Sequence, residues 1–203
     1  DGSGSMGYGA STLRKFDYAR AVAASLGYLL VSQRDAVGLI TFDTEIRERI
    51  DPSTNRMTFQ RIAAALDAMQ PGQETSLAQV FAQIAPSLKR RSLLIIISDF
   101  FDNLEHLGQA LKQFRHANHE VLMLQIVAPE EEDFPFNKPT MFRSLELDSH
   151  RVLVDPHRLR TMYLQQYQDF ISELTQICGH NHIDYIKLLT TEPYYKALGA
   201  YLS

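Results

Sequence analysis

Near the middle of the chain stands Leu93-Leu94-Ile95-Ile96-Ile97-Ser98-Asp99, five large aliphatic residues followed by a hydroxyl and a carboxylate. An uninterrupted apolar run of this length is typical of a parallel strand that is covered on both faces. A second such run occupies residues 121–127, and residues 104–114 between them have the spacing of an amphipathic helix. The order strand, helix, strand predicts the βαβ unit of a parallel sheet.

The same alternation extends to both sides of this unit. Further strands are expected at 35–42, 45–50 and 184–189, and further helices at 16–30, 58–69, 75–88, 155–177 and 193–202. Thr58 is the expected N-cap of one helix, and Asp102 of the helix that begins at Leu104. The chain therefore predicts an α/β fold with a doubly wound, mostly parallel sheet and flanking helices.

Residues 129–154 interrupt this rhythm. The acidic run Glu130–Asp133 is typical of a solvated loop. Apolar triplets at 145–147 and 152–154 flank a turn at Asp148-Ser149 and predict a β-hairpin insertion near 140–154. Because no repeat or flexible linker is present, we expect residues 1–203 to form a single domain.

Composition narrows the possible functions. The 203 residues are 45% hydrophobic and 22% charged, the usual mixture for a soluble globular chain. A net charge of −4 argues against a nucleic-acid partner. No apolar run approaches the roughly 20 residues of a membrane helix, so we expect no membrane insertion by this segment. The single cysteine, Cys178, excludes an internal disulfide framework and favours a reducing, cytoplasmic location.

The first five residues, Asp1-Gly2-Ser3-Gly4-Ser5, combine three oxygen-bearing side chains with two glycines that let the loop curl. Oxygen ligands that carry few charges suit Mg²⁺, with Mn²⁺ and Ca²⁺ as other options. Thr75 at a helix start and Asp99 after the buried strand are further candidates, since loops at the carboxyl ends of adjacent parallel strands meet. The predicted metal ligands are Asp1, Ser3, Ser5, Thr75 and Asp99.

This arrangement resembles the metal-ion-dependent adhesion site of von Willebrand factor A domains. A second set of short segments is spread along nearly the whole chain: Tyr18-Ala19-Arg20, Asp35-x-Val37-Gly38-Leu39, Leu88-Lys89-Arg90-Arg91, Asp133-Phe134-Pro135-Phe136, Val154-Asp155-Pro156 and Asp184-Tyr185. In these segments the chain resembles the bacterial domain-of-unknown-function family 58.

The resemblance implies a divalent-metal-dependent protein-interaction module and not an enzyme. Ser3, Ser5 and Thr75 would ligate the cation directly, and Asp1 and Asp99 largely through water. A carboxylate of a protein partner would fill the open coordination position. Family genes often lie beside MoxR-type AAA+ ATPases, which implies such an ATPase as a partner. Ser76 departs from the family, whose members carry an acidic or amide residue there.

Two other classes of protein share parts of this pattern. Residues 2–7 also spell G-x-G-x-x-G, but a dinucleotide site needs a helix at once, and here helical spacing begins only after Leu13. A haloacid-dehalogenase-like Mg²⁺-dependent phosphatase or phosphotransfer enzyme is the alternative function. Such enzymes need a second Asp two residues after the nucleophile as general acid, where this chain has Ser3.

The sheet also predicts a strand that the alternation does not supply. The helix at 16–30 needs an apolar surface to cover, and central parallel strands are covered on both faces. We therefore expect an apolar segment of about five or six residues directly upstream of Asp1. Its place, between the strand of Leu39 and the strand of Ile95, should be open or be filled by another chain.

Overall fold

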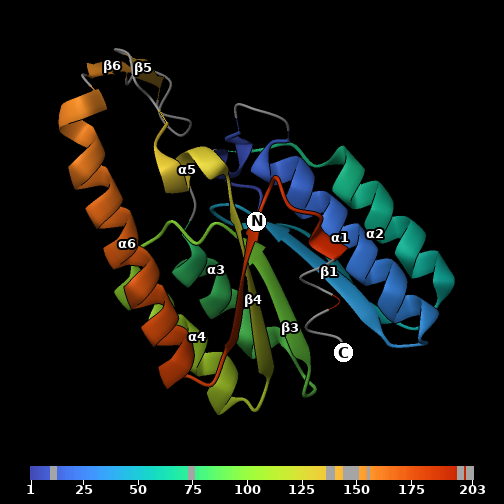
Figure 1. The fold of residues 1–203 in the computed structure, drawn as a ribbon. Helices are drawn as coiled ribbons and strands as arrows, with labels where there is room; N and C mark the ends of the chain where they lie inside the picture. Colours follow the sequence, from blue (N-terminus) through green and yellow to red (C-terminus); the bar gives the residue numbers. More distant parts are fainter. Residues whose placement is uncertain are drawn as a thin grey trace.

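Helices and strands alternate along most of the chain, as Figure 1 shows. The structure, a computed structural model, describes residues 1–9, 13–72, 76–135, 140–143, 151–154, 156–195 and 199. Its elements are η1 (Gly4–Gly7), α1 (Lys15–Ser32), β1 (Val37–Phe42), β2 (Ile46–Ser53), α2 (Arg56–Ala68), α3 (Leu77–Ile84), η2 (Ala85–Ser87), β3 (Leu93–Ser98), α4 (Leu104–His116), β4 (Glu120–Val127), α5 (Pro129–Asp133), β5 (Thr140–Arg143), β6 (Arg151–Val154), α6 (Pro156–His180) and β7 (Asp184–Leu189).

A three-stranded parallel sheet in the order β3-β4-β7 forms the centre of the molecule. Ile95 of β3 lies beside Leu122 of β4, and Leu124 of β4 lies beside Ile186 of β7. Helix α1 covers one face of this sheet, and α3, α4 and α6 lie on the other (Figure 1). The predicted βαβ order of 93–127 is therefore confirmed.

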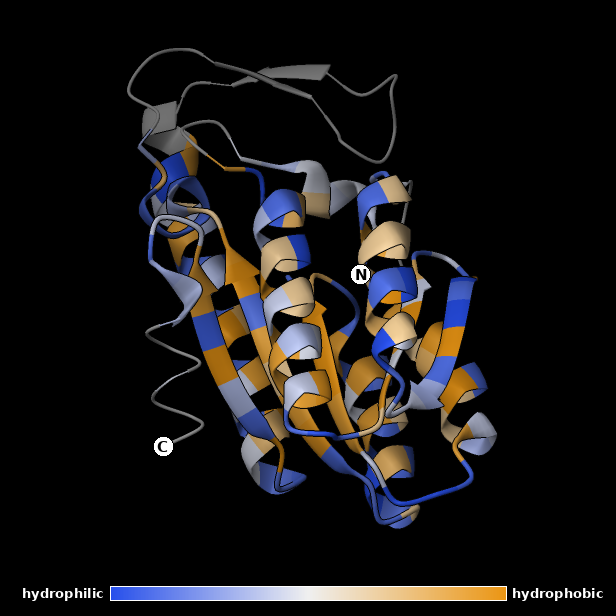
Figure 2. Ribbon diagram, turned by 90° about the vertical axis from the view of Figure 1, so that its right-hand side faces the viewer, coloured by the Kyte–Doolittle hydropathy of each residue, from blue (hydrophilic) through white to orange (hydrophobic). Residues whose placement is uncertain are grey.

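Of the elements whose side chains are described, strand β4 is the most deeply buried, with seven of its eight residues buried. Leu122, Leu124 and Ile126 pack with residues of α1, because alternate side chains of a strand point to the same face. Val121 and Met123 point the other way, into the cluster formed with α3, α4 and α6. Figure 2 shows the resulting band of hydrophobic residues through the sheet.

Strands β1 and β2 form a separate antiparallel pair that packs against α1 and α2. Gly38 of β1 lies so close to β2 that a Cβ there would stand 2.6 Å from the Ile50 carbonyl oxygen, so no larger residue fits. The prediction of a parallel sheet with flanking helices is therefore confirmed, whereas a doubly wound sheet stays a prediction. The structure shows a mixed α/β fold with a three-stranded parallel sheet flanked by helices.

In the described residues β1 and β3 are not hydrogen-bonded to each other. The first two residues connect their carboxyl ends instead: the backbone nitrogen of Asp1 lies 3.1 Å from Ile97 O, and Gly2 N donates to Phe42 O at 2.7 Å. Direct pairing between β1 and β3 therefore does not occupy the place expected for a further strand. The segment expected to fill it stays a prediction.

Strand β3 differs from its expectation of cover on both faces. Only Ile96 and Ser98 are buried, Leu93 is 46% exposed, and the other residues are half-buried. In the described part of the chain, β3 pairs with β4 along one edge only. Its other edge has no neighbouring strand among the described residues, and the residues of β3 are therefore more exposed than those of a central strand.

The expected N-cap of the second long helix is wrong by one turn. Asn55 is the N-cap of α2, and its side chain accepts a hydrogen bond from Met57 N at 2.9 Å. Thr58 lies inside the first turn and is buried. Both residue types are good N-caps, and the helix begins after the earlier of the two.

The N-cap expected at Asp102 is also wrong. Asn103 caps α4 by accepting from His106 N at 3.0 Å. The Asp102 carboxylate instead accepts from Leu77 N at 2.7 Å, in the first turn of α3. A capping group supplied by a distant loop has no signal in the local sequence.

Residues 129–154 differ most from the structure expected from the sequence. The acidic run expected as a solvated loop forms α5, and Glu131 within it is only 9% exposed. The predicted hairpin is present as the antiparallel pair β5–β6, with Thr140 opposite Val154. Residues 145–147 and most of the helix expected at 193–202 lie outside the described residues.

Candidate metal centre

The backbone of the first loop is fixed between the carboxyl ends of β1 and β3. Besides its bond to Phe42 O, Gly2 accepts from Gly72 N at 2.6 Å through its carbonyl oxygen. A side chain at Gly2 would collide with the end of the Met69 side chain. Three chain segments thus meet at Gly2, where any larger residue would require the Met69 side chain to move.

The hydroxyls of Ser3 and Ser5 converge within this loop. Their Oγ atoms lie 3.1 Å apart, and Ser3 N donates to the Asp1 carboxylate at 2.8 Å. Ser3 is fully buried, whereas Ser5 is half-buried. These contacts bring Asp1, Ser3 and Ser5 together, and their role as metal ligands stays a prediction.

A turn after β3 connects Asp1 to Asp99. Ser98 Oγ donates to the other Asp1 carboxylate oxygen at 2.6 Å, and it accepts from Phe100 N at 2.9 Å. Phe100 has a φ of +60°, in the left-handed region that costs a non-glycine residue energy. Its ring is fully buried, so packing holds the strained turn that presents Asp99.

Lys15, the first residue of α1, contacts the Asp99 side chain and has no exposed surface. Its ammonium donates to Asp99 Oδ2 at 2.7 Å and to Glu131 Oε1 at 2.5 Å. The ring centroid of Phe101 lies 5.0 Å from the same nitrogen, within cation–π range. Burial lowers the pKa of Lys15, but the two carboxylates outweigh it and raise the pKa above its usual value.

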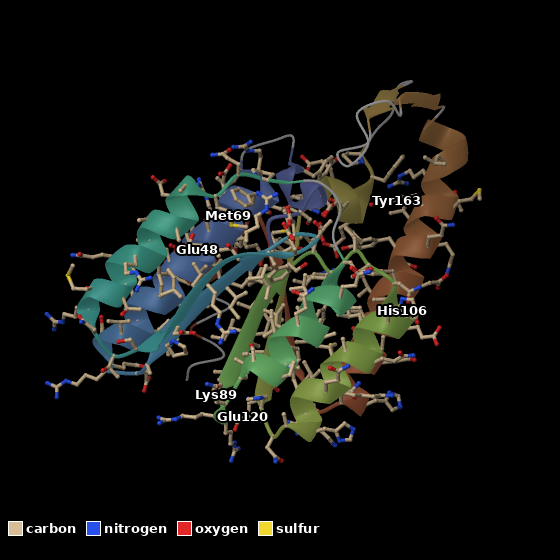
Figure 3. The ribbon with its side chains drawn as sticks, turned by 180° about the vertical axis from the view of Figure 1, so that it is seen from behind. Glu48, Met69, Lys89, His106, Glu120 and Tyr163 are labelled. Atoms are coloured by element: carbon tan, nitrogen blue, oxygen red, sulfur yellow. The ribbon has the colours of Figure 1, made fainter. Side chains whose placement is uncertain are left out.

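Glu131 is held in place by contacts from two other elements. Its second carboxylate oxygen accepts from Ala128 N at 2.9 Å. Tyr163 of α6, labelled beside α5 in Figure 3, donates its hydroxyl to the Glu131 carbonyl oxygen at 2.9 Å. Burial and the Glu131 charge raise the pKa of Tyr163, so its hydroxyl stays protonated as a donor.

Gln125, the one polar side chain in the buried part of β4, fixes the backbone of Asp99. Its Nε2 donates to Asp99 O at 3.1 Å, and its Oε1 accepts from the Tyr185 hydroxyl at 2.5 Å. Gln125 is fully buried. Both the amide nitrogen and the amide oxygen of Gln125 therefore have a hydrogen-bond partner, as buried polar groups require.

Four of the five predicted metal ligands are in the described chain, and Thr75 lies outside it. The structure joins Asp1, Ser3 and Ser5 by hydrogen bonds and links Asp1 to Ser98, the residue before Asp99. In the described residues no three or more His, Cys, Asp or Glu side chains are grouped to hold a metal. Serine hydroxyls beside a carboxylate nevertheless suit a hard divalent cation, so this donor set fits Mg²⁺.

Sequence reasoning missed Lys15, Ser98, Gln125 and Glu131. One signal was available for Lys15, which stands three, four and seven residues before the buried Tyr18, Ala19 and Val22 of α1. A lysine on an apolar stripe needs a buried anion. The partner itself, 116 positions along the chain, could not be inferred.

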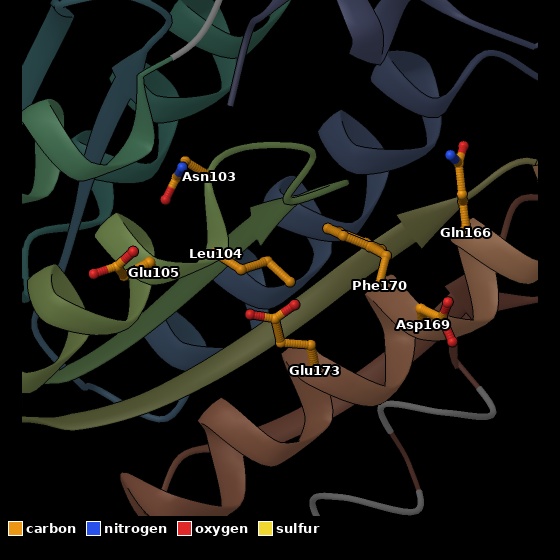
Figure 4. A pocket seen from close by; sticks show the side chains of 7 residues that line it. All are labelled: Asn103, Leu104, Glu105, Gln166, Asp169, Phe170 and Glu173. Carbon is orange, nitrogen blue, oxygen red and sulfur yellow. The ribbon is translucent and has the colours of Figure 1, made fainter.

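An open pocket near this region is acidic and does not include the predicted ligands. Its wall joins the start of α4 to the middle of α6, where Phe170 packs on Phe101 at 5.1 Å (Figure 4). It is lined by Asn103, Leu104, Glu105, Gln166, Asp169, Phe170 and Glu173.

Solved structures with the same fold support a mixed α/β domain. The conserved hypothetical protein BatB from Bacteroides thetaiotaomicron is similar with a TM-score of 0.65 and 16% identity, covering 100% of this chain and 93% of that one. An aerotolerance-related membrane protein from Bacteroides fragilis NCTC 9343, with multiple mutations to serines, has a TM-score of 0.65 and 15% identity. That match covers 98% of this chain and 92% of the other.

The family model described as protein of unknown function DUF58 matches residues 1–170, and the chain belongs to this family. The matched range includes the first loop, the β3 turn and α5. No sequence among the curated proteins matches the chain significantly. Among the described residues, no helix combines the length and apolar character that a membrane span requires.

Proposed function

We propose that this chain is a von Willebrand factor A-like module that binds protein partners through a divalent cation held at the first loop. The observation that carries the proposal is the pair of Ser3 and Ser5 hydroxyls, 3.1 Å apart beside the Asp1 carboxylate. Ser98 ties this group to the turn that presents Asp99. The adhesion-site pattern of the sequence names the same residues, with Thr75 as the further ligand.

The residues present favour recognition of an anionic group. A bound Mg²⁺, or Mn²⁺ or Ca²⁺, would supply a Lewis-acidic centre whose charge few direct ligands neutralise. Ser3 and Ser5 would hold the cation through neutral oxygens, and Asp1 would orient the loop through Ser3 N. A partner carboxylate then has an attractive position to fill. A MoxR-type AAA+ ATPase is the partner we propose.

The enzyme alternative has weaker support. A dehalogenase-like phosphatase requires a carboxylic acid two residues after its nucleophile, and this position is Ser3, whose hydroxyl contacts Ser5. We therefore propose a binding module and not a catalyst. A cytoplasmic location likewise stays a proposal, and one of the similar structures is described as a membrane protein.

Thermal and urea unfolding with Mg²⁺ tests the cation site. At ten times its dissociation constant, a cation that binds only the folded chain adds about 1.4 kcal/mol to the free energy of unfolding. Ser3→Ala/Ser5→Ala removes both hydroxyls and should abolish this increment. Ser32→Ala, which removes an exposed hydroxyl at the far end of α1, should retain it.

Equal responses to Mg²⁺ in all three proteins would contradict the cation site. Capture of a purified MoxR-type ATPase by the immobilised wild-type chain then tests the partner. We expect capture in Mg²⁺, none in a chelator, and none by Asp1→Ala in Mg²⁺. Hydrolysis of a generic phosphate ester that depends on Asp1 would favour the enzyme alternative instead.

A further inference from the structure

A buried lysine contacts Asp99, one of the candidate metal ligands, and the adhesion-site pattern gives it no role. Lys15 has no exposed surface, so its ammonium depends entirely on protein groups for its hydrogen bonds. Asp99 and Glu131 supply two acceptors, and the Phe101 ring covers a further side of the charge. Two of its three N–H donors thus have carboxylate acceptors, and an aromatic ring lies against the charge.

Each oxygen of Asp99 already accepts one hydrogen bond. Oδ2 accepts from Lys15, Oδ1 accepts from Phe101 N at 3.2 Å, and the carbonyl oxygen accepts from Gln125. A carboxylate oxygen can bind two partners, but a cation on Oδ2 would lie beside the Lys15 ammonium and repel it, so direct ligation would displace the lysine. That exchange would leave a buried ammonium with one carboxylate partner, an unfavourable state in a site that excludes water.

The local charges balance a divalent cation. Asp1, Asp99 and Glu131 carry three negative charges and Lys15 one positive charge, which leaves a formal charge of −2. A divalent cation would therefore neutralise the group without any change at Lys15.

Resting on the proposed function, we propose that Lys15 is a positioning residue that keeps Asp99 out of direct ligation of the cation. The cation is then left to neutral serine oxygens and water, and it keeps its affinity for an anionic oxygen of the partner. Through Glu131, the same lysine connects the metal centre to α5 and, by way of Tyr163, to α6.

The decisive variant removes the lysine without changing the charge. In Lys15→Met/Glu131→Gln, Asp1 and Asp99 keep the formal charge at −2, so a change in cation affinity cannot come from net charge. With Oδ2 released, Asp99 becomes available as an anionic ligand, and anionic ligands strengthen the binding of hard cations. We expect Mn²⁺ to bind about tenfold more tightly and to lose one directly bound water, measured by water-proton relaxation.

The matched control is Lys112→Met/Glu105→Gln, which makes the same two changes on the exposed face of α4. It should bind Mn²⁺ as the wild type does, with the same number of bound waters. Unchanged affinity and hydration in Lys15→Met/Glu131→Gln would overturn the role of Lys15 alone. A wild-type chain that binds no Mn²⁺ would instead contradict the proposed function on which the role rests.

A measurement on the wild-type protein decides the question if the double variant does not fold. The ammonium of a buried lysine exchanges its protons slowly and can be followed by ¹⁵N nuclear magnetic resonance. Saturation with Mg²⁺ should leave the Lys15 signal in place, because its bond to Asp99 persists. Loss of that signal when Mg²⁺ binds would show that the cation takes Asp99 from the lysine, and would overturn the inference.

Discussion

Strands β3 and β4 lie side by side in parallel and are both rich in Leu and Ile, yet they differ sharply in burial. Seven of eight residues are buried in β4, against two of six in β3. The difference follows from their neighbours: β4 lies between β3 and β7, whereas β3 pairs only with β4 in the described residues. An apolar run therefore identifies a strand but not the number of strands that flank it.

The less covered strand is the one that carries the candidate chemistry. Asp99 follows β3, and Asp1 and Gly2 bridge from β3 to β1 at the same end. The deeply buried β4 contributes Gln125, which holds the Asp99 backbone from the side. The buried strand β4 thus supports the turn after β3 that carries Asp99.

The largest expected effect is a difference in stability loss between alanine substitutions at paired positions of β4 and β3. Leu122 and Ile95 are register partners that point to the same face, but Leu122 is 1% exposed and Ile95 is half-buried. Leu122→Ala should lower the free energy of unfolding by about 3 kcal/mol because it leaves a cavity. Ile95→Ala should cost about 1 kcal/mol, since part of its surface is already in water.

Urea denaturation of both variants gives these two values. Equal losses would mean that β3 is covered as completely as β4, for which a strand in the space beside it would be the direct explanation. The same experiment thereby tests whether the half-exposed edge of β3 persists in solution.

The next effect comes from filling the space between β1 and β3. A parallel strand there would pair with both edges and cover half-buried side chains such as Ile40 and Ile95. Extending the chain before Asp1 by a five- or six-residue segment rich in Val and Ile should raise stability by about 2 kcal/mol, the gain from covering one large aliphatic side chain. Denaturation measures the gain.

A segment of the same length made of Gly and Ser is the control for this extension and should give no increase. A Val- and Ile-rich segment that leaves both the free energy of unfolding and the exposure of β3 unchanged would contradict a strand position between β1 and β3.

Local periodicity was sufficient to predict most elements of the fold. The helices α1, α4 and α6 and the strands β1, β3, β4 and β7 begin within a few residues of their expected positions, because each repeats apolar residues at its own period. The cap expected at Asp102 failed because its carboxylate accepts from the distant Leu77 N, a contact with no trace in the local sequence. The cap expected at Thr58 failed because Asn55, an equally suitable N-cap three residues earlier, begins the helix.

The candidate site was predictable only where it is contiguous or marked by a strand end. Asp1, Ser3 and Ser5 stand together in the sequence, and Asp99 follows an unmistakable strand. The Lys15–Glu131 ion pair joins residues 116 positions apart, and the acidic run around Glu131 has the composition of a surface loop. Of the four acidic residues, Glu131 is the one that is buried, because of how α5 packs. The composition of the segment does not predict that packing.

The smallest expected effect concerns the polar contact at the carboxyl end of β4. Tyr185→Phe removes the hydroxyl that donates to Gln125 Oε1, and a buried acceptor without its donor should cost about 1 kcal/mol of stability. Because Gln125 also holds the Asp99 carbonyl, loosening it should increase hydrogen exchange at the Phe100 amide while leaving the first half of β4 protected. Tyr195→Phe alters a side chain that is 65% exposed and should change neither quantity.

Denaturation and residue-resolved hydrogen exchange measure both effects. A stability loss in Tyr185→Phe with unchanged exchange at Phe100 would mean that β4 does not hold the turn after β3, and the division between a supporting strand and a ligand-presenting strand would be wrong.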